Sequence, residues 1–80
     1  MIKVECRLYA TLRKYAPDYG LGEAMELELP DGTTLTELYE LLKVPPDEVK
    51  RVFVSGLSRG PGHALSDGDR IALFPPIAGG

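Results

Sequence analysis

The sequence predicts a small α+β domain in which one main helix packs across one β-sheet. The chain has 80 residues, which is enough for a single domain. Two stretches in the N-terminal part of the chain alternate apolar and polar residues with the period of a half-buried strand, and only one stretch combines helical spacing with a capping signal. The apolar fraction of 44% supports one compact core. The expected order is therefore strand, strand, helix, strand, strand and a C-terminal tail.

The N-terminal part of the chain contains the first two predicted strands. Residues 2–8 alternate apolar with mostly charged side chains, and residues 25–29 alternate Met and Leu with Glu, so each strand buries one face. Between them, residues 11–16 predict a single helical turn that ends at Pro17. Turn-forming residues at 30–32 end the second strand.

The predicted helix runs from Thr34 to Lys43. Thr34 and Glu37 have the spacing of a capping box, in which each side chain accepts a hydrogen bond from the other residue's backbone N–H. Pro45 and Pro46 end the helix. Leu35, Leu38 and Leu42 fall at positions i, i+3 and i+7 and form its apolar stripe, and Leu41 lies beside this stripe.

The last third of the chain predicts two more strands. Residues 52–54 form a short apolar strand, residues 56–63 a glycine- and proline-rich loop, and residues 67–68 a tight turn. The last strand, 70–74, places Ile71 and Leu73 on one face and Ala72 and Phe74 on the other. The resulting predicted core is Ile2, Val4, Cys6, Leu8, Leu27, Leu38, Leu42, Val52, Val54, Ile71 and Leu73.

Composition excludes several classes of function. The net charge of −3 argues against a nucleic-acid binder, because phosphate neutralisation needs a clustered positive surface. No apolar run approaches the ~20 residues that span a bilayer, and the alternating N-terminus is unlike a secretory signal. We therefore expect no membrane association and a cytoplasmic location. A single cysteine excludes an intrachain disulfide.

The sequence contains no recognisable catalytic constellation. Phosphate-binding, nucleophile-elbow and zinc-protease motifs are absent. His63 lies in the predicted loop and is interpreted as a solvated residue, and Cys6 as a core residue. Asp67 and Asp69 flank a glycine and are interpreted as turn residues, so we expect no metal site.

The C-terminus is the exception. The sequence finishes with Pro75-Pro76-Ile77-Ala78-Gly79-Gly80 directly after the last strand. Glycine has no Cβ, so such an arm can enter a channel too narrow for other residues, and fully extended it reaches roughly 17 Å. The prolines stiffen its base. We expect residues 75–80 to leave the domain as a flexible tail, although a tail without function would look similar.

The last sixteen residues resemble the MoaD/ThiS family of sulfur carriers, which are ubiquitin-like β-grasp proteins. The shared features are a leucine, a polar residue, Asp67-Gly68-Asp69, a strand, a Pro-Pro pair and the terminal Gly-Gly. The resemblance covers the whole chain, and Phe74-Pro75-Pro76 is closer to the molybdopterin branch than to the thiamine branch. It implies a β-grasp domain over residues 1–80, with the first and last strands parallel and adjacent at the sheet centre.

The resemblance also implies a function. In this family an E1-like (MoeB-like) enzyme adenylates the terminal glycine with ATP, here Gly80, and a sulfur donor enzyme converts it to a thiocarboxylate. A large, MoaE-like synthase subunit then uses the sulfur to build the molybdenum (or tungsten) cofactor. The carrier would bind no permanent cofactor and would not be an enzyme alone. Gly79 would ease entry into the partner's active site.

A partner-binding surface is implied at the base of the tail, comprising Phe74, Pro75, Pro76, Ile77 and Ala78. Phe74 is either an exposed anchor or a partly buried aromatic at the strand end. Three other functions stay open at this point. The chain could carry sulfur for thiamine, tRNA thiolation or cysteine synthesis. It could modify proteins through Gly80, or it could be an interaction module with an inert tail.

Overall fold

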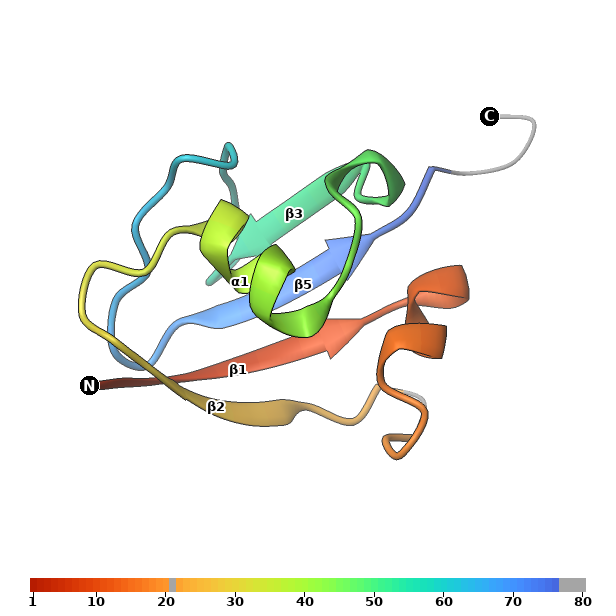
Figure 1. Cartoon of the computed structure of the whole chain (residues 1–80), viewed down its shortest axis with the longest axis horizontal. Coiled ribbons are helices and arrows are strands. Elements are labelled where there is room, and N and C mark those ends of the chain that lie inside the picture. The colour runs from red at the N-terminus through yellow and green to blue at the C-terminus, as the bar shows by residue number, and fades with distance from the viewer. Residues whose placement is uncertain (21, 77–80) are drawn as a thin grey trace.

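The computed structural model describes residues 1–20 and 22–76, which form a two-layer α+β structure with a helix packed on a sheet (Figure 1). One face of a five-stranded sheet is covered by the main helix, α1, and the other face is open. The elements in chain order are β1 (Ile2–Leu8), η1 (Ala10–Tyr15), β2 (Met25–Leu29), α1 (Leu35–Leu42), η2 (Pro46–Glu48), β3 (Arg51–Val54), β4 (Leu57–Ser58) and β5 (Arg70–Phe74).

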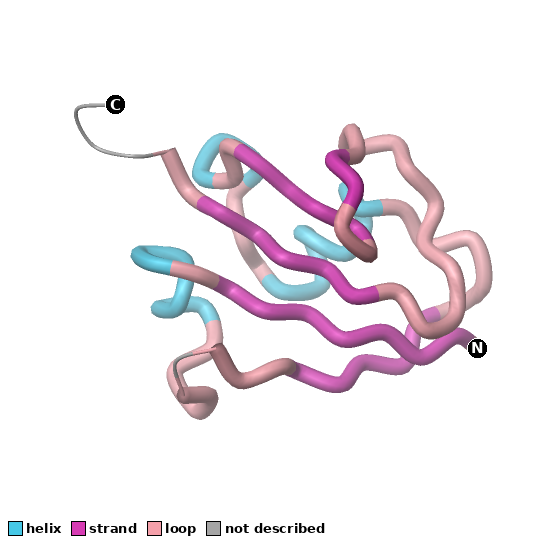
Figure 2. Tube along the Cα trace, turned by 180° about the vertical axis from the view of Figure 1, so that it is seen from behind, coloured by secondary structure: helices cyan, strands magenta, loops and turns pink. Residues whose placement is uncertain are grey.

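The strand order is β2-β1-β5-β3-β4, and the sheet is mixed (Figure 2). β1 and β5 are adjacent and parallel, with Cys6 opposite Ile71 and Leu8 opposite Leu73, as the resemblance implied. The β1–β2, β3–β5 and β3–β4 pairs are antiparallel. This arrangement confirms the predicted β-grasp fold.

Helix α1 begins as the sequence predicts. The Thr34 hydroxyl accepts a hydrogen bond from the Glu37 N–H at 3.3 Å, and the Glu37 carboxylate accepts one from the Thr34 N–H at 2.9 Å. The helix ends at Lys43, whose φ of 60° is left-handed and allows the chain to turn back. Leu35 and Leu38 are fully buried, whereas Leu41 is exposed.

Most of the predicted core is buried, but two members are corrected. Leu27 is only half-buried, although Met25 and Leu29 on the same face of β2 are buried, and Leu42 is half-buried at the last position of the helix. Seven further buried residues are not in the predicted core. They are Leu12, Met25, Leu29, Leu35, Tyr39, Val44 and Leu65.

The predicted loop at 56–63 contains the short strand β4, which is a correction. Ser55 and Gly56 form the tight connection between β3 and β4, with φ angles of 50° and 86°. Two consecutive positive φ values match the twist of a two-residue hairpin turn. A serine with a left-handed φ is uncommon, because among residues other than glycine this region is enriched in Asn, Asp and His. The helical turn predicted at 11–16 is present as a 3-10 helix one residue earlier.

Candidate functional site at the base of the tail

The predicted site straddles the boundary of the described structure. Ile77, Ala78, Gly79 and Gly80 lie outside the described residues, so their predicted roles stay predictions. Phe74 is half-buried, Pro75 is buried and Pro76 is exposed. The packed domain therefore extends one residue further than the predicted start of the tail.

Two backbone hydrogen bonds hold the end of β5 between its neighbours. The Tyr9 N–H donates to the Leu73 carbonyl at 3.2 Å, and the Lys50 N–H donates to the Phe74 carbonyl at 2.8 Å. Pro75 and Pro76 have no N–H and cannot donate to the sheet. The regular pairing of β5 therefore ends at Phe74, one residue before the Pro-Pro pair.

The 3-10 helices η1 and η2 are joined at this end of the sheet. The Tyr15 hydroxyl donates to Glu48, and the Lys14 ammonium forms an ion pair with Glu48 at 3.2 Å. We call this group the Lys14–Tyr15–Glu48 clasp. Hydrogen bonds from Tyr15 and Lys14 lower the pKa of Glu48, and the same carboxylate raises the pKa of both partners. Since β1 leads into η1 and β3 follows η2, the clasp connects the strands on both sides of β5.

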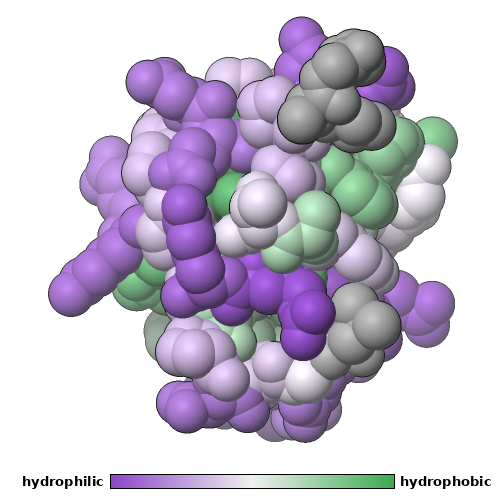
Figure 3. Space-filling view, turned by 90° about the vertical axis from the view of Figure 1, so that its right-hand side faces the viewer, coloured by the Kyte–Doolittle hydropathy of each residue, from purple (hydrophilic) through white to green (hydrophobic). Residues whose placement is uncertain are grey.

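An aromatic cluster lies on the open face beside the end of β5. Tyr9 stacks on Phe74 with ring centroids 4.7 Å apart and an interplanar angle of 5°, and Phe53 meets Phe74 edge-on at 5.8 Å. Figure 3 shows hydrophobic surface on the side of the sheet away from α1. Phe74 thus lies on the open face but is half-buried by its neighbours, which matches the second of its two predicted alternatives, a partly buried aromatic at the strand end. The sequence analysis did not identify Tyr9 and Phe53 as site residues; Phe53 occupies an outward position of β3, and Tyr9 follows the last residue of β1.

A hollow of about 260 Å³ adjoins the aromatic cluster. It lies on the open face along β5, between β1 and β3. Its lining combines aromatic, small and cationic side chains: Arg7, Tyr9, Phe53, Gly56, Arg70, Ile71, Ala72 and Phe74.

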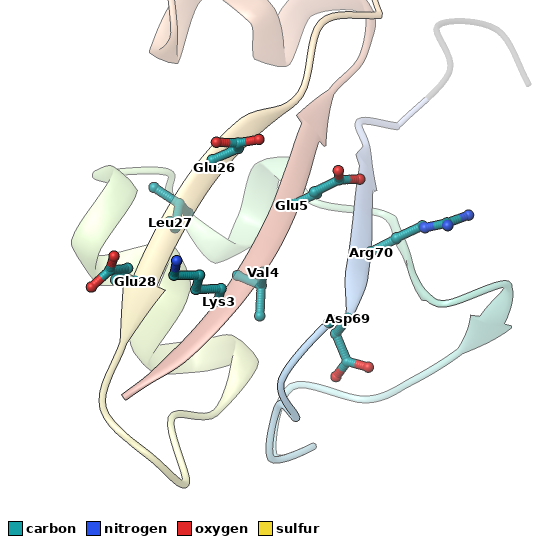
Figure 4. Close-up of a pocket in the computed structure, with 9 residues that line it drawn as sticks. Lys3, Val4, Glu5, Glu26, Leu27, Glu28, Asp69 and Arg70 are labelled. Atoms are coloured by element: carbon teal, nitrogen blue, oxygen red, sulfur yellow. The ribbon is translucent and has the colours of Figure 1, made fainter.

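A larger hollow, of about 540 Å³, runs along β1 and β2 on the same face (Figure 4). Figure 4 shows charged side chains extending from three neighbouring strands, among them Glu26, Glu5 and Arg70. Glu5 lies opposite Glu26 and Lys3 lies opposite Glu28 in the sheet. Among residues 1–20 and 22–76, no group of three or more His, Cys, Asp or Glu side chains could hold a metal ion.

Asp67 and Asp69 are turn residues, as predicted. Asp67 accepts a hydrogen bond from the Lys3 N–H at 2.8 Å, and Asp69 accepts one from the Ser66 N–H at 2.7 Å. Gly68 adopts a φ of 85° and donates its N–H to the Lys3 carbonyl at 2.7 Å. The Asp-Gly-Asp motif therefore joins the start of β1 to the start of β5, at the end of the sheet opposite the tail.

The remaining two candidate side chains carry no reactive site. Cys6 is fully buried, and burial raises the pKa of its thiol to about 12. The thiol is consequently protonated at neutral pH, which agrees with its interpretation as a core residue. His63 is half-buried rather than solvated, because its backbone pairs with α1: the Leu35 N–H donates to its carbonyl at 3.1 Å.

The fold and the strand that runs into the tail define a ubiquitin-like β-grasp protein. The sequence model of the ThiS family matches residues 6–80, so the chain belongs to this family, the MoaD/ThiS family of small sulfur-carrier and ubiquitin-like proteins. Members of this family are non-catalytic carriers. None of the curated proteins matches the chain.

Three solved structures illustrate the similarity of fold. A putative molybdopterin converting factor subunit 1 from Pyrococcus furiosus is 25% identical, with a TM-score of 0.72, covering 96% of this chain and 100% of that chain. Small archaeal modifier protein 1 of H. volcanii is 22% identical, with a TM-score of 0.74 and coverage of 96% and 100%. A complex of subunits 1 and 2 of molybdopterin-converting factor from Helicobacter pylori contains a chain that is 24% identical, with a TM-score of 0.61 and coverage of 99% and 100%. In the described part of this chain, every helix is too short or too polar to cross a membrane.

Proposed function

We propose that this protein is the sulfur-carrier small subunit of molybdopterin synthase, with Gly80 as the residue that carries sulfur. The observation that supports this most directly is the end of β5. The strand pairs through Phe74, packs through Pro75 and then leads into the Gly-Gly sequence, with a half-buried aromatic cluster at its side. The similarity to the P. furiosus protein favours the molybdopterin branch of the family.

The chemistry requires an activated C-terminal carboxylate. An E1-like enzyme would catalyse attack of the Gly80 carboxylate on the α-phosphate of ATP, with pyrophosphate leaving. A sulfide-level donor would then displace AMP and leave a thiocarboxylate. When the thiocarboxylate passes its sulfur to the cyclic pterin precursor, water returns an oxygen to Gly80 and restores the carboxylate.

The carrier itself contributes a reactive end on a rigid support. In the described residues, the one thiol is buried and protonated, so it does not compete with Gly80 as a sulfur site. General acid and base groups would come from the large subunit. The two hydrogen bonds to Leu73 and Phe74, together with the clasp, fix the point from which the tail extends.

The open face beside the tail is the proposed docking surface for the large subunit. Interface centres are enriched in aromatic residues, and here Phe74 is central to a stacked and edge-on trio on an otherwise charged sheet face. The H. pylori complex of subunits 1 and 2 shows that a protein with this fold pairs with a second subunit. We propose a corresponding pairing for this chain.

Intact-mass analysis tests the proposal. The protein is incubated with a candidate E1-like enzyme, ATP and a sulfur donor, and we expect one oxygen to be replaced by sulfur at the C-terminus. Deletion of Gly80 should abolish sulfur transfer to the pterin precursor while the melting temperature stays unchanged. Gly79→Val should be nearly as damaging, because a β-branched side chain obstructs a narrow channel and small misplacements cost about 100-fold in rate.

Gly62→Val is the matched control, because a Cβ at Gly62 meets nothing within 4 Å and the residue lies in a distant loop. Normal sulfur transfer by the chain lacking Gly80 would overturn the proposal. Adducts joined from Gly80 to lysines of other proteins, without transfer to the pterin, would instead identify the chain as a protein modifier.

A further inference from the structure

The hollow beside the aromatic cluster is produced by one small residue in a row of large ones. In the sheet register, Ala72 of β5 lies opposite Arg7 of β1 on one side and Phe53 of β3 on the other. All three side chains point to the open face, because in each strand the residues immediately before and after them are buried beneath α1. The methyl group of Ala72 is therefore the floor of a depression between two long side chains.

The walls of this hollow differ in chemistry. Toward the tail it is bounded by the stacked rings of Tyr9 and Phe74. Toward the other end of β5 it is bounded by Arg70. Its volume of about 260 Å³ far exceeds the ~30 Å³ share of one water molecule, so it has room for a large side chain.

The cationic side chains around the hollow are not neutralised to the same degree. Arg7 is held toward the opposite side, because its Nε donates to the Gly22 carbonyl at 3.0 Å and its guanidinium lies 3.6 Å from Glu5. Arg70 is exposed and makes no ion pair with any residue of the described ranges. Arg51, also exposed, lies opposite Phe74 in the sheet.

The net charge of the chain is −3, and Glu5 lies opposite Arg70 in the sheet. Among the described residues, neither Arg70 nor Arg51 forms an ion pair, so a carboxylate on a partner could bind either guanidinium, with an apolar surface between them. A guanidinium can form two parallel hydrogen bonds with one carboxylate, and this pairing is strongest where the surface is partly desolvated. The hollow also shares Phe74 with the base of the tail, so a protein that accepts the tail lies directly against it.

We infer that the hollow over Ala72 receives an apolar side chain of the large subunit, flanked there by carboxylates that pair with Arg70 and Arg51. This inference rests on the proposed function and specifies the partner surface: an apolar projection bordered by acidic residues. Apolar contact gives the affinity, and the arginines select the partner by charge and accelerate its association.

Binding to the purified large subunit of the same organism tests the inference by titration calorimetry at low and high salt. Ala72→Leu fills the hollow and should weaken binding by about 10-fold or more, equivalent to ~1.4 kcal/mol. Arg70→Glu should weaken binding by a similar factor at low salt and reduce the salt dependence. Ala64→Leu, at an exposed position in the loop before β5, and Lys43→Glu, at the exposed end of α1, should bind like the unaltered chain. Unchanged melting temperatures establish that all four variants fold.

The failures can be told apart. If the unaltered chain acquires the thiocarboxylate and transfers sulfur, but Ala72→Leu and Arg70→Glu bind normally, the inference is wrong and the proposed function stands. If the unaltered chain does not bind the large subunit, both are wrong. If the isolated chain sediments as a dimer that Ala72→Leu disrupts, the hollow belongs to self-association and the inference is again overturned.

Discussion

The two faces of the sheet differ in chemistry, and we propose that one provides stability and the other recognition. The face beneath α1 is aliphatic and fully enclosed, with Leu38, Ile71 and Leu73 at most 1% exposed. The open face carries charged side chains along β1 and β2 and an aromatic cluster at the end of β5. Substitutions on the covered face should therefore alter folding, and substitutions on the open face should alter binding.

The largest expected effect concerns Cys6 on the covered face. Burial raises its pKa to about 12, so the thiolate fraction near pH 8 should be about 1,000-fold lower than for an ordinary thiol. A thiol-specific disulfide reagent should leave the native chain unmodified and should modify one thiol per chain in denaturant. Rapid modification of the native chain would show that the covered face opens, and it would revive Cys6 as an alternative site for carrying sulfur.

Leu38→Ala is expected to have the next largest effect. The side chain is fully enclosed between α1 and the sheet, so its truncation should lower the free energy of unfolding by ~2–5 kcal/mol. The midpoint of urea denaturation measures this loss. Leu41→Ala is the control from the same helix, since Leu41 is 60% exposed and should change the midpoint little. Equal effects of the two substitutions would mean that the wrong face of α1 has been assigned to the core.

Phe74→Ala should have the opposite profile. Loss of the two ring contacts, with Tyr9 and with Phe53, should lower the free energy of unfolding by roughly 1–3 kcal/mol. Binding to the large subunit should weaken by about 10-fold or more, because aromatic anchors dominate interface energies. Chemical conversion of the Gly80 carboxylate to a thiocarboxylate, without any partner protein, should be unaffected. If Phe74→Ala unfolded the chain, and its folded fraction still bound the large subunit with unchanged affinity, the distinction between the two faces would be wrong.

Much of the fold could be predicted because local patterns determine it. Alternation identified β1 and β2, and the Thr34–Glu37 capping box identified the start of α1. Isolated apolar residues were missed: Val44 and Leu65 follow no period, and their burial depends on how distant segments pack. The strand β4 was missed because it has only two residues and lies among glycines and a proline.

The site was predictable only where it is continuous in the sequence. The Phe74-Pro75-Pro76 segment and the Gly-Gly end are adjacent in the chain, so a motif can identify them. Tyr9 and Phe53 join Phe74 only through the β1–β5 and β3–β5 pairings. The clasp likewise connects Tyr15 to Glu48 across 33 positions. The strand order had to be known before either group could be recognised.

The smallest expected effect concerns the clasp, which lies at the edge of both faces. Glu48→Gln keeps a hydrogen-bond acceptor for Tyr15 but removes the charge that pairs with Lys14. Because the pKa of Glu48 is lower in the folded chain than in the unfolded chain, its stabilisation is present above an ordinary glutamate pKa of about 4.3. That stabilisation is lost as the pH falls through the folded value.

Thermal denaturation at several pH values should therefore show a small deficit for Glu48→Gln at pH 7, which shrinks below about pH 4 as the native carboxylate is protonated. Glu40→Gln on exposed α1 surface is the control, and it should show no comparable convergence with the unaltered chain. A deficit that stays constant down to pH 2 would mean that Glu48 contributes through packing alone. In that case the ion pair with Lys14 would not help to hold η1 and η2 together beside the tail.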